Sequence, residues 1–341
     1  MILFRADGNT KIGMGHIMRC LSIADTFQRR GKDCAFVLAD TSMQETISAR
    51  KYKTVILDSD YQYMDDEIKK LESVIKKMSP EMVIIDSYFV TKQYLECVKS
   101  MVRLAYIDDL GAFAYPADIL INYNAYSLAM DYKSMYFEES VSYPMTLFGA
   151  KYAPIRECFK NIPTRIQNDR CRNILISTGG SDLIHLAVDF VRYMRGNKDA
   201  VDYHLLVGGM NPDKQEIYQL TEEIPNLHIH FNVTDMKTLI SSCDLAVTAA
   251  GSTMYEICAC GVPMITYVAA DNQIPGAEAF ERMGLAVSCG DFRKENDPGR
   301  KIYEGIKELS KNYKQRVNMG KRMQRFVDGW GADRIVDELI V

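Results

Sequence analysis

Short apolar runs rich in β-branched residues alternate with amphipathic segments from the first residue to about residue 300. A strand inside a parallel sheet is apolar on both faces, and each crossover to the next parallel strand needs a helix-sized segment. The alternation therefore predicts an α/β fold of doubly wound parallel sheets. The strand candidates are residues 2–7, 34–40, 54–58, 82–87, 104–109 and 118–124 in the first half, and residues 173–178, 203–208, 227–232, 244–250, 263–268 and 285–290 in the second.

One amphipathic segment, from Met64 to Met78, has the clearest helical pattern. Its apolar residues Ile68, Leu71 and Ile75 are three and four positions apart, among lysines and glutamates. This spacing is that of a helix with a single apolar stripe. We expect the stripe to pack on the sheet.

The polar segment from residue 157 to residue 173 interrupts the alternation. It contains Pro163 and many charged residues but no apolar period, so we interpret it as a linker. The chain is then divided into two domains, residues 1–160 and residues 161–341. Because such sheets bind ligands beyond the carboxyl ends of their strands, two facing domains are expected to enclose a cleft. Residues 313–341 are expected to form one or two helices broken at DGWGAD, with no strand after them.

Composition limits the class of partner. Of the 341 residues, 41 are basic and 45 acidic, the formal net charge is -4, and 47% are hydrophobic. A folded chain with this balance has no strongly basic surface for nucleic acid or an anionic membrane, so a small molecule or a protein is the expected partner. The start, MILFRAD, has charges where a signal peptide continues its apolar core, and no apolar run approaches the roughly 18 residues of a membrane span. We expect a cytoplasmic protein.

The nine cysteines are odd in number, and most lie within apolar periodic runs. We interpret them as small buried hydrophobes in a reducing compartment. Cys258 and Cys260 have no second pair to complete a metal site. His228 and His230 share one face of a strand candidate, but no carboxylate or cysteine completes metal-ligand spacing. We therefore interpret these histidines as an ordinary strand face, and we expect no metal.

The sequence KIGMGHIMRC follows the first strand candidate and begins a helical pattern. Gly13 and Gly15 allow a tight turn, and His16 and Arg19 lie one helical turn apart on nearly the same face. A dinucleotide fingerprint would need a third glycine where Met18 stands, and no Walker loop is present, so nicotinamide and P-loop chemistry are disfavoured. A helix start suits an anion, and imidazole exchanges a proton near neutral pH. His16 is therefore a candidate for acid–base catalysis, with a hydrogen-bonded structural histidine as the alternative.

Two turns in the second half share one form, in which a strand is followed by small residues and a helix start. NILISTGGSD contains Gly180 and Ser181, and DLAVTAAGSTMYE contains Gly251, Ser252 and Thr253. Two such turns at strand ends indicate a paired phosphate site, and helix capping alone is the alternative.

Other polar residues also follow strand candidates. Glu256 lies one turn into its helix, where it can accept hydrogen bonds from both ribose hydroxyls or form part of a solvated face. Asn272 and Gln273 can contact a base or a sugar hydroxyl. In the first half, a carboxylate can orient His16 or cap the next turn, and the polar residues at these strand ends are Asp86, Tyr88, Asp108 and Asp109.

The motifs GMGH, DSY, NYNAY, FGAKYAPIREC, GGSD, AAGSTMYE and DNQ occur in this order between residue 1 and about residue 290. In this combination the chain resembles the nucleotide-sugar hydrolases of the pseudaminic acid pathway, the PseG family, which is grouped with spore-coat polysaccharide biosynthesis proteins. The resemblance implies a GT-B fold of two Rossmann-like domains, of which the second binds UDP, with a last helix that crosses back to the first. It also implies hydrolysis of UDP-2,4-diacetamido-2,4,6-trideoxy-β-L-altropyranose to the free sugar and UDP without a required metal. We expect no cofactor, no nucleic-acid or membrane partner, and a monomer or weak dimer.

The resemblance assigns roles by position. His16 corresponds to the proposed general base, and Tyr88 to a cleft tyrosine, although Ser87 stands where a histidine can precede that tyrosine. Arg156, within YAPIRE, corresponds to a nucleotide-contacting arginine. The matches to the UDP-binding turns are Gly180, Ser181, Ser252, Thr253 and Glu256, and the expected substrate-binding set is completed by Gly13, Gly15, Arg19, Gly251, Asn272 and Gln273.

In the expected mechanism His16 takes a proton from a water that attacks C1 opposite the leaving UDP, which inverts the anomeric centre. Three alternatives use the same nucleotide site. A GT-B glycosyltransferase differs only in its acceptor, a hydrolysing epimerase of the legionaminic acid pathway acts on an isomeric sugar, and a nucleotide-sugar sensor would leave His16 a spectator.

Overall fold

The computed structural model describes residues 1–195, 199–221, 224–231 and 233–340. The chain divides into two compact units, Met1–Pro154 together with Trp330–Val341, and Ile155–Gly329. The sequence places the boundary after residue 160, whereas the structure places it after Pro154. The last helix belongs to the first unit, the domain to which the family resemblance has it cross back.

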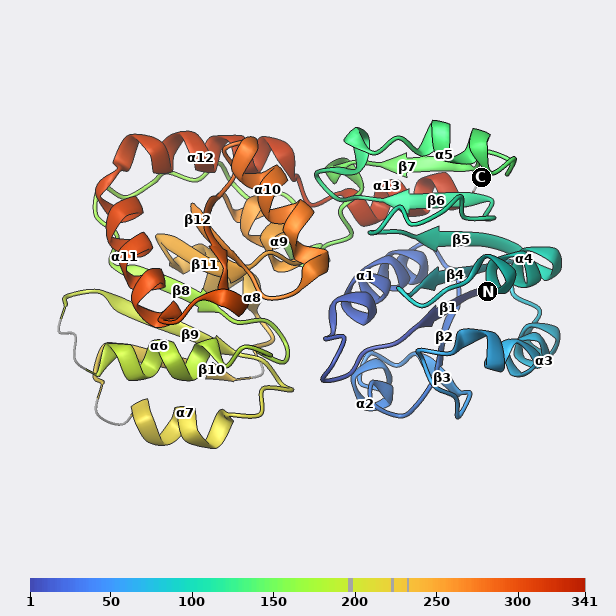
Figure 1. Cartoon of the computed structure of the whole chain (residues 1–341), viewed down its shortest axis with the longest axis horizontal. Helices are drawn as coiled ribbons and strands as arrows, with labels where there is room; N and C mark the ends of the chain where they lie inside the picture. The colour runs from blue at the N-terminus through green and yellow to red at the C-terminus, as the bar shows by residue number, and fades with distance from the viewer. Residues whose placement is uncertain (196–198, 222–223, 232, 341) are drawn as a thin grey trace. The chain divides into compact units, whose positions relative to one another are not determined.

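A seven-stranded sheet forms the centre of the first unit (Figure 1). Its strand order is β3-β2-β1-β4-β5-β6-β7, and every neighbouring pair is parallel. Six strands confirm the expected segments, and the seventh, a short strand at the sheet edge, was not expected. The strands are β1 (Ile2–Ala6), β2 (Cys34–Leu38), β3 (Lys53–Ile56), β4 (Met82–Asp86), β5 (Arg103–Ile107), β6 (Ile119–Asn122) and β7 (Met145–Phe148).

Helices follow most of these strands. The expected helix from Met64 to Met78 begins with a 3-10 turn, and its α-helical part starts at Ile68. The helices of the first unit are α1 (Gly15–Arg29), α2 (Gln44–Ser48), α3 (Ile68–Met78), α4 (Lys92–Met101), α5 (Tyr132–Glu138) and α13 (Gly331–Leu339), with 3-10 turns η1 (Met64–Glu67), η2 (Ser127–Ala129) and η3 (Ala150–Tyr152).

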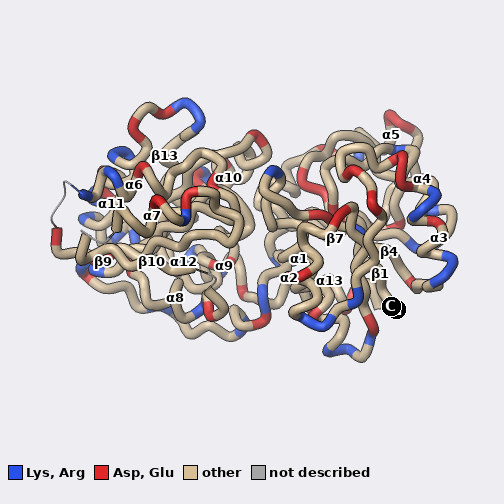
Figure 2. Tube along the Cα trace, turned by 90° about the horizontal axis from the view of Figure 1, so that it is seen from below, with Lys and Arg blue, Asp and Glu red and all other residues tan. Residues whose placement is uncertain are grey.

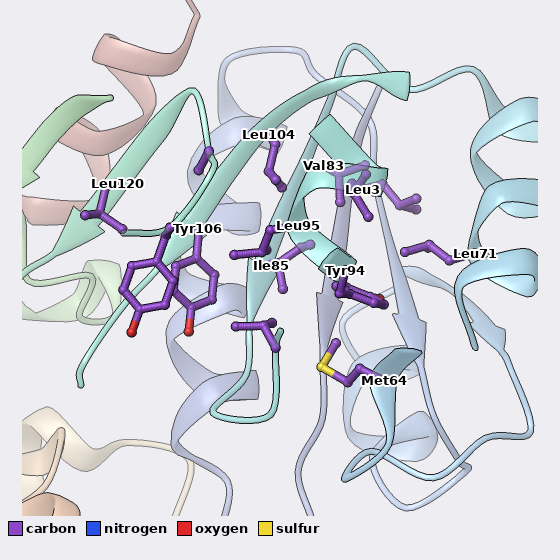
Figure 3. Packing of buried hydrophobic residues seen from close by; sticks show 14 of the residues in the cluster. Leu3, Met64, Leu71, Val83, Ile85, Tyr94, Leu95, Leu104, Tyr106 and Leu120 are labelled. Carbon is purple, nitrogen blue, oxygen red and sulfur yellow. The ribbon is translucent and has the colours of Figure 1, made fainter. Parts of the chain in front are cut away.

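The apolar stripe of α3 packs on one face of this sheet, as its spacing predicts. Leu71 and Ile75 are buried there, with Tyr94 and Leu95 of α4 beside them. Figure 3 shows Leu71, Tyr94 and Leu95 directed toward the apolar residues of the central strands. The packing on this face is apolar and holds the strands in position. The polar residues expected to form the functional site are not part of it.

The last helix, α13, packs against α1 (Figure 1). Arg30 pairs with Asp337 at 2.7 Å, and Arg103 donates a hydrogen bond to the carbonyl oxygen of Leu339 at 2.9 Å. Gly331 begins the helix against the backbone of Ala153, where a side chain would clash. These contacts attach the end of the chain to the helix that begins with the glycine–histidine loop.

The second unit has a six-stranded parallel sheet in the order β10-β9-β8-β11-β12-β13. All six expected strands are present. They are β8 (Asn173–Ser177), β9 (Asp202–Val207), β10 (Leu227–Phe231), β11 (Leu245–Ala249), β12 (Met264–Val268) and β13 (Val287–Asp291).

The helices of this unit are α6 (Leu186–Met194), α7 (Lys214–Thr221), α8 (Met236–Ser242), α9 (Thr253–Cys260), α10 (Ile274–Arg282), α11 (Pro298–Lys311) and α12 (Tyr313–Phe326). Its 3-10 turns are η4 (Glu157–Phe159), η5 (Asp271–Gln273) and η6 (Phe292–Lys294). The break at DGWGAD separates α12 from α13, as the sequence predicts.

The interpretation of residues 157–173 as a linker is wrong. Arg316, fully buried on α12, donates hydrogen bonds to the carbonyl oxygens of Asn168 and Asp169, both at 2.8 Å. Gln324 accepts a hydrogen bond from the backbone N–H of Arg165 at 2.9 Å. The segment lacks an apolar period because hydrogen bonds of its backbone and of polar side chains such as Gln167 and Asn168, rather than an apolar face, hold it to the second unit.

Charges of both signs are interspersed over both units (Figure 2). No helix among the described residues is both long enough and apolar enough to cross a membrane.

Candidate active site

The strand order of the first unit brings two distant loops together. β1 and β4 are neighbours, with Ala6 opposite Asp86, and the connections leave them toward opposite halves of the sheet. Ligands of doubly wound sheets bind at such a switch point. The glycine loop follows β1, Asp86 ends β4, and α1 begins at Gly15, so His16 lies at a helix start as predicted.

His16 contacts Asp86 through its Nδ1 atom, which lies 2.6 Å from the carboxylate Oδ1. His16 is buried, and Asp86 has no exposed surface. A buried carboxylate accepts hydrogen bonds, so in the neutral imidazole the proton lies on Nδ1 and is donated to Asp86. The lone pair of the ring is then on Nε2, which leaves that atom as the proton acceptor.

Arg19 is held between two carboxylates. Its Nε and Nη2 atoms donate to the two oxygens of Asp86, both at 2.5 Å, and Nη1 and Nη2 donate to the two oxygens of Asp109 at 3.0 and 2.8 Å. Nη1 also donates to the hydroxyl of Tyr123 at 2.8 Å. All five guanidinium N–H groups therefore have acceptors within the chain. This arrangement favours a positioning role for Arg19 over the expected contact with substrate.

Charge compensation keeps both carboxylates ionised. Burial alone would raise the pKa of Asp86, but the Arg19 charge and the contact with His16 outweigh it and hold that pKa well below its usual range. Burial likewise opposes ionisation of Asp109, and Arg19 again lowers its pKa overall. The cluster is thus two carboxylates around one guanidinium, with an imidazole hydrogen-bonded to one of them.

Tyr88 lies against His16. Its hydroxyl donates to Asp109 at 3.0 Å, and the two rings meet edge to face with centroids 4.4 Å apart. The sequence did not single out Tyr123 or Asn124, which also contact this cluster, the latter through a 2.7 Å hydrogen bond to Asp109. The NYN motif at the end of β6 was the available signal, because β6 neighbours β5 in the sheet.

Asp108 has the alternative role, that of a turn cap. It accepts hydrogen bonds from the backbone of Leu110 and Gly111 at 2.8 and 3.0 Å, and a further one from the Tyr132 hydroxyl at 2.5 Å. Burial raises the pKa of Asp108. Asp108 and Asp86 are both aspartates at the ends of neighbouring strands, so residue type alone does not indicate which of them contacts His16.

The glycine loop is closed by a backbone bridge between Asn9 and Gly13. Gly13 takes φ of 75°, in the left-handed region that favours glycine. The Asn9 side chain accepts hydrogen bonds from the N–H groups of Lys11 and Ile12, at 2.8 and 3.0 Å. The loop therefore enters α1 in a defined conformation at Gly15.

In the second unit, the two small-residue turns follow β8 and β11, which are neighbours at the switch point of that sheet. After β8, Gly179 takes φ of 81°, Gly180 accepts a backbone hydrogen bond from Met210, and Ser181 is buried. Asp182 accepts hydrogen bonds from the first N–H groups of α6, from Leu186 and Ala187. Asp182 therefore serves as the cap, which leaves the Ser181 hydroxyl outside that role.

The turn after β11 leads directly into α9. Gly251 precedes Ser252 at the helix N-cap, and Thr253 is the first helical residue. Within the described chain, the Ser252 side chain makes no capping hydrogen bond. The start of α9 is thus open at a strand end beside the GGSD turn.

Arg156 and Glu256, both expected to contact the nucleotide, form a two-bonded ion pair. Arg156 Nε and Nη2 donate to the two carboxylate oxygens, each at 2.7 Å, and both side chains are largely buried. Burial opposes the charge of Arg156, but the bonds to Glu256 raise its pKa overall. The pair orients the Glu256 carboxylate on the first turns of α9.

Asn272 and Gln273 lie in the 3-10 turn after β12. Gln273 uses its side-chain oxygen to accept a hydrogen bond from Ala269 at 2.8 Å, so this amide closes its own loop. Asn272 is exposed at the same turn.

Among the described residues, no group of three or more His, Cys, Asp or Glu side chains is placed to hold a metal ion. Cys258 and Cys260 are free and buried in α9, in agreement with their interpretation as core residues, and Cys20 and Cys243 are also buried. The interpretation of all nine cysteines as buried is wrong for Cys158, which is exposed, and four others are only partly buried, namely Cys34, Cys97, Cys171 and Cys289.

Comparisons with known proteins agree with this architecture. Residues 173–331 match the model of the glycosyltransferase family 28 C-terminal domain. The uncharacterized protein MJ1062 of Methanocaldococcus jannaschii is 26% identical over 76% of this chain, which spans only about half (54%) of that relative. Spore coat polysaccharide biosynthesis protein SpsG of Bacillus subtilis is 22% identical over 97% of this chain and 95% of its own. The UDP-2,4-diacetamido-2,4,6-trideoxy-beta-L-altropyranose hydrolase of Campylobacter jejuni is 24% identical over 75% of this chain and 86% of its own.

Solved structures define the class of fold. MurG of Acinetobacter baumannii superposes with a TM-score of 0.65 at 15% identity, over 98% of both chains. The UDP co-structure of MnaA from S. aureus gives a TM-score of 0.67 at 12% identity, over 99% of this chain and 95% of that one. The protein thus has a GT-B α/β fold, built from two parallel-sheet Rossmann-like units.

Proposed function

We propose that this protein hydrolyses a UDP-linked 2,4-diacetamido-2,4,6-trideoxyhexose, the altropyranose, to the free sugar and UDP. The named activity of the C. jejuni relative supports the substrate class, and the family 28 match supports a nucleotide-sugar site in the second unit. The observation that carries the proposal is the 2.6 Å contact between Nδ1 of His16 and Asp86. Because Nδ1 faces this carboxylate, the lone pair on Nε2 is directed away from the charged cluster, at the switch point of the sheet where ligands bind.

The second unit binds the UDP group in this proposal. The turns after β8 and β11 are neighbours, and they present the buried Ser181 and the open start of α9 at Ser252 and Thr253. Backbone N–H groups at a helix start favour a phosphate, through their hydrogen bonds and the positive end of the helix dipole. Glu256, held by Arg156, accepts hydrogen bonds from the ribose hydroxyls.

His16 acts as the general base. A water oxygen forms a bond to C1 of the sugar while one proton of that water passes to Nε2 of His16. The bond between C1 and the phosphate oxygen breaks, and its electron pair leaves with UDP. The attack from the opposite side inverts C1. Asp86 stabilises the imidazolium through the hydrogen bond to Nδ1, and Arg19 keeps Asp86 ionised.

A glycosyltransferase is the second candidate, because the family model that matches residues 173–331 is a glycosyltransferase domain. The same base would then remove a proton from a sugar hydroxyl instead of from water. The two functions differ in whether an acceptor is required.

The distinguishing experiment incubates the purified protein with the UDP-linked diacetamido altropyranose and no acceptor, and measures release of UDP and free sugar. UDP-N-acetylglucosamine serves as the matched control donor. We expect stoichiometric release of both products, faster than from the control donor. Binding of UDP without turnover of the altropyranose would contradict the hydrolase and favour the transferase.

A further inference from the structure

Three of the five histidines of the chain lie on one face of the sheet in the second unit, on β9 and β10. These parallel strands pair with His228 opposite His204, and His230 lies two residues further along the same face. The sequence placed His228 and His230 together, but it had no signal for the position of His204.

His204 and His230 face each other through ring nitrogens. Nδ1 of His204 lies 3.1 Å from Nε2 of His230, and Nε2 of His204 lies 3.1 Å from the side-chain oxygen of Asn173. Because that amide oxygen only accepts, His204 carries its proton on Nε2 and presents a bare Nδ1 to His230. A hydrogen bond from the far nitrogen of a histidine is the usual way in which the ring of a metal ligand is oriented.

We propose that His204 and His230 form a two-imidazole site for a borderline divalent cation such as Zn²⁺, Ni²⁺ or Cu²⁺. Two nitrogens 3.1 Å apart can both lie about 2.0–2.1 Å from one ion at an angle of roughly 100°. The His230 proton moves from Nε2 to Nδ1 when the ion binds, so both rings stay neutral. Waters fill the remaining positions.

The surroundings suit this class of ion. Burial, together with the neighbouring histidine rings, lowers the pKa of both His204 and His230. Both side chains are half-buried, which leaves the pair accessible. His228 is not counted as a ligand, because its ring stacks on the ring of His204, with centroids 5.1 Å apart, instead of facing the His204 Nδ1 atom; its Nε2 atom is hydrogen-bonded to Asp202 at 2.9 Å.

The cation site is independent of the proposed hydrolysis. It uses strands β9 and β10 and none of the residues assigned to the nucleotide or to proton transfer. Cation binding can therefore be tested separately from turnover.

The test titrates the full chain with Cu²⁺ and Zn²⁺ at neutral pH, by calorimetry and by electron paramagnetic resonance of the copper form. We expect one equivalent of Cu²⁺ with hyperfine coupling to two imidazole nitrogens. His204→Gln and His230→Gln should each weaken binding at least tenfold and remove one nitrogen coupling.

His228→Gln is the matched control on the same strand face, and His185→Gln is the control for an exposed histidine paired with a carboxylate. Both should change the affinity by less than threefold. Thermal unfolding without metal verifies that each variant folds. If His204→Gln does not fold, the test relies on His230→Gln, because His230 lies on the edge strand. An absence of binding, or unchanged binding in both His204→Gln and His230→Gln, would overturn the proposal.

Discussion

Nδ1 of His16 lies 2.6 Å from Oδ1 of Asp86, although the two residues are 70 positions apart in the chain. The parallel pairing of β1 with β4 produces this contact, because both residues lie at the carboxyl ends of adjacent strands. Arg19, one turn after His16, binds the same carboxylate. The helix that presents the histidine thus also presents the cation that keeps its partner charged.

Asp86→Asn should lower turnover by about 10²-fold or more while the affinity for UDP changes little, because the amide no longer stabilises an imidazolium. The pH profile of kcat should shift as well, which loss of folded protein alone would not cause. Asp108→Asn is the matched control, since that carboxylate ends the neighbouring strand and caps a turn. Equal losses in the two variants would contradict the positioning role of Asp86.

Replacing Arg19 should destabilise the fold strongly. Arg19→Met leaves Asp86 and Asp109 buried without their counter-charge, at a cost of about 3–5 kcal/mol in the free energy of unfolding. Arg30→Met, at the C-cap of the same helix, breaks an exposed pair with Asp337 and should cost only about 0–1 kcal/mol. Urea unfolding of both variants measures the difference, and similar values for the two would contradict the assignment.

The contribution of Asp86 to stability should depend on pH. Its pKa is lowered in the folded protein, so its stabilising effect is complete above the unfolded pKa of about 4 and is lost as the pH falls toward the folded value. The difference in unfolding free energy between wild type and Asp86→Asn should therefore still include the full contribution of the Asp86 charge at pH 5. It should be smaller at pH 3, falling by at most about 1.4 kcal/mol per pH unit. A difference that stays constant to pH 3 would show that the carboxylate is not held ionised by its neighbours.

Glu256→Gln should weaken UDP binding by roughly tenfold, because an amide is a poorer acceptor for two ribose hydroxyls and loses the charge that Arg156 orients. Calorimetric titration with UDP measures this effect, and thermal unfolding verifies the fold. Glu278→Gln, an exposed glutamate in the same unit, is the control and should bind UDP as the wild type does. Unchanged affinity in Glu256→Gln would remove that carboxylate from the proposed nucleotide site.

Local pattern was sufficient to predict most of the fold, since buried parallel strands are apolar on both faces and read as continuous runs. The exception in the first unit was β7, a four-residue strand at the sheet edge, of which only Leu147 is fully buried. The segment 157–173 was misinterpreted for the opposite reason. Its order comes from hydrogen bonds of its backbone with Arg316 and Gln324 and of its side chains Gln167 and Asn168 with Gly261 and Asp244, which leave no periodic trace in the sequence.

The candidate site was predictable only in part. His16 at a helix start follows from the glycine loop, but three carboxylates at strand ends could each have been its partner. The choice of Asp86 depends on strand order and side-chain direction, which the sequence does not specify. Arg19 was expected to bind substrate because it shares the face of His16, and its five intramolecular hydrogen bonds could not be inferred from spacing.

The most direct measurement follows the hydrolysis in ¹⁸O-labelled water without an acceptor, using wild type and His16→Gln, with mass spectrometry of both products. We predict that the label appears on C1 of the sugar and not on UDP. In His16→Gln, turnover should fall by about 10²–10⁴-fold while UDP affinity stays within about threefold. Label on the phosphate of UDP, or unchanged turnover in His16→Gln, would contradict attack at C1 by a water that His16 deprotonates.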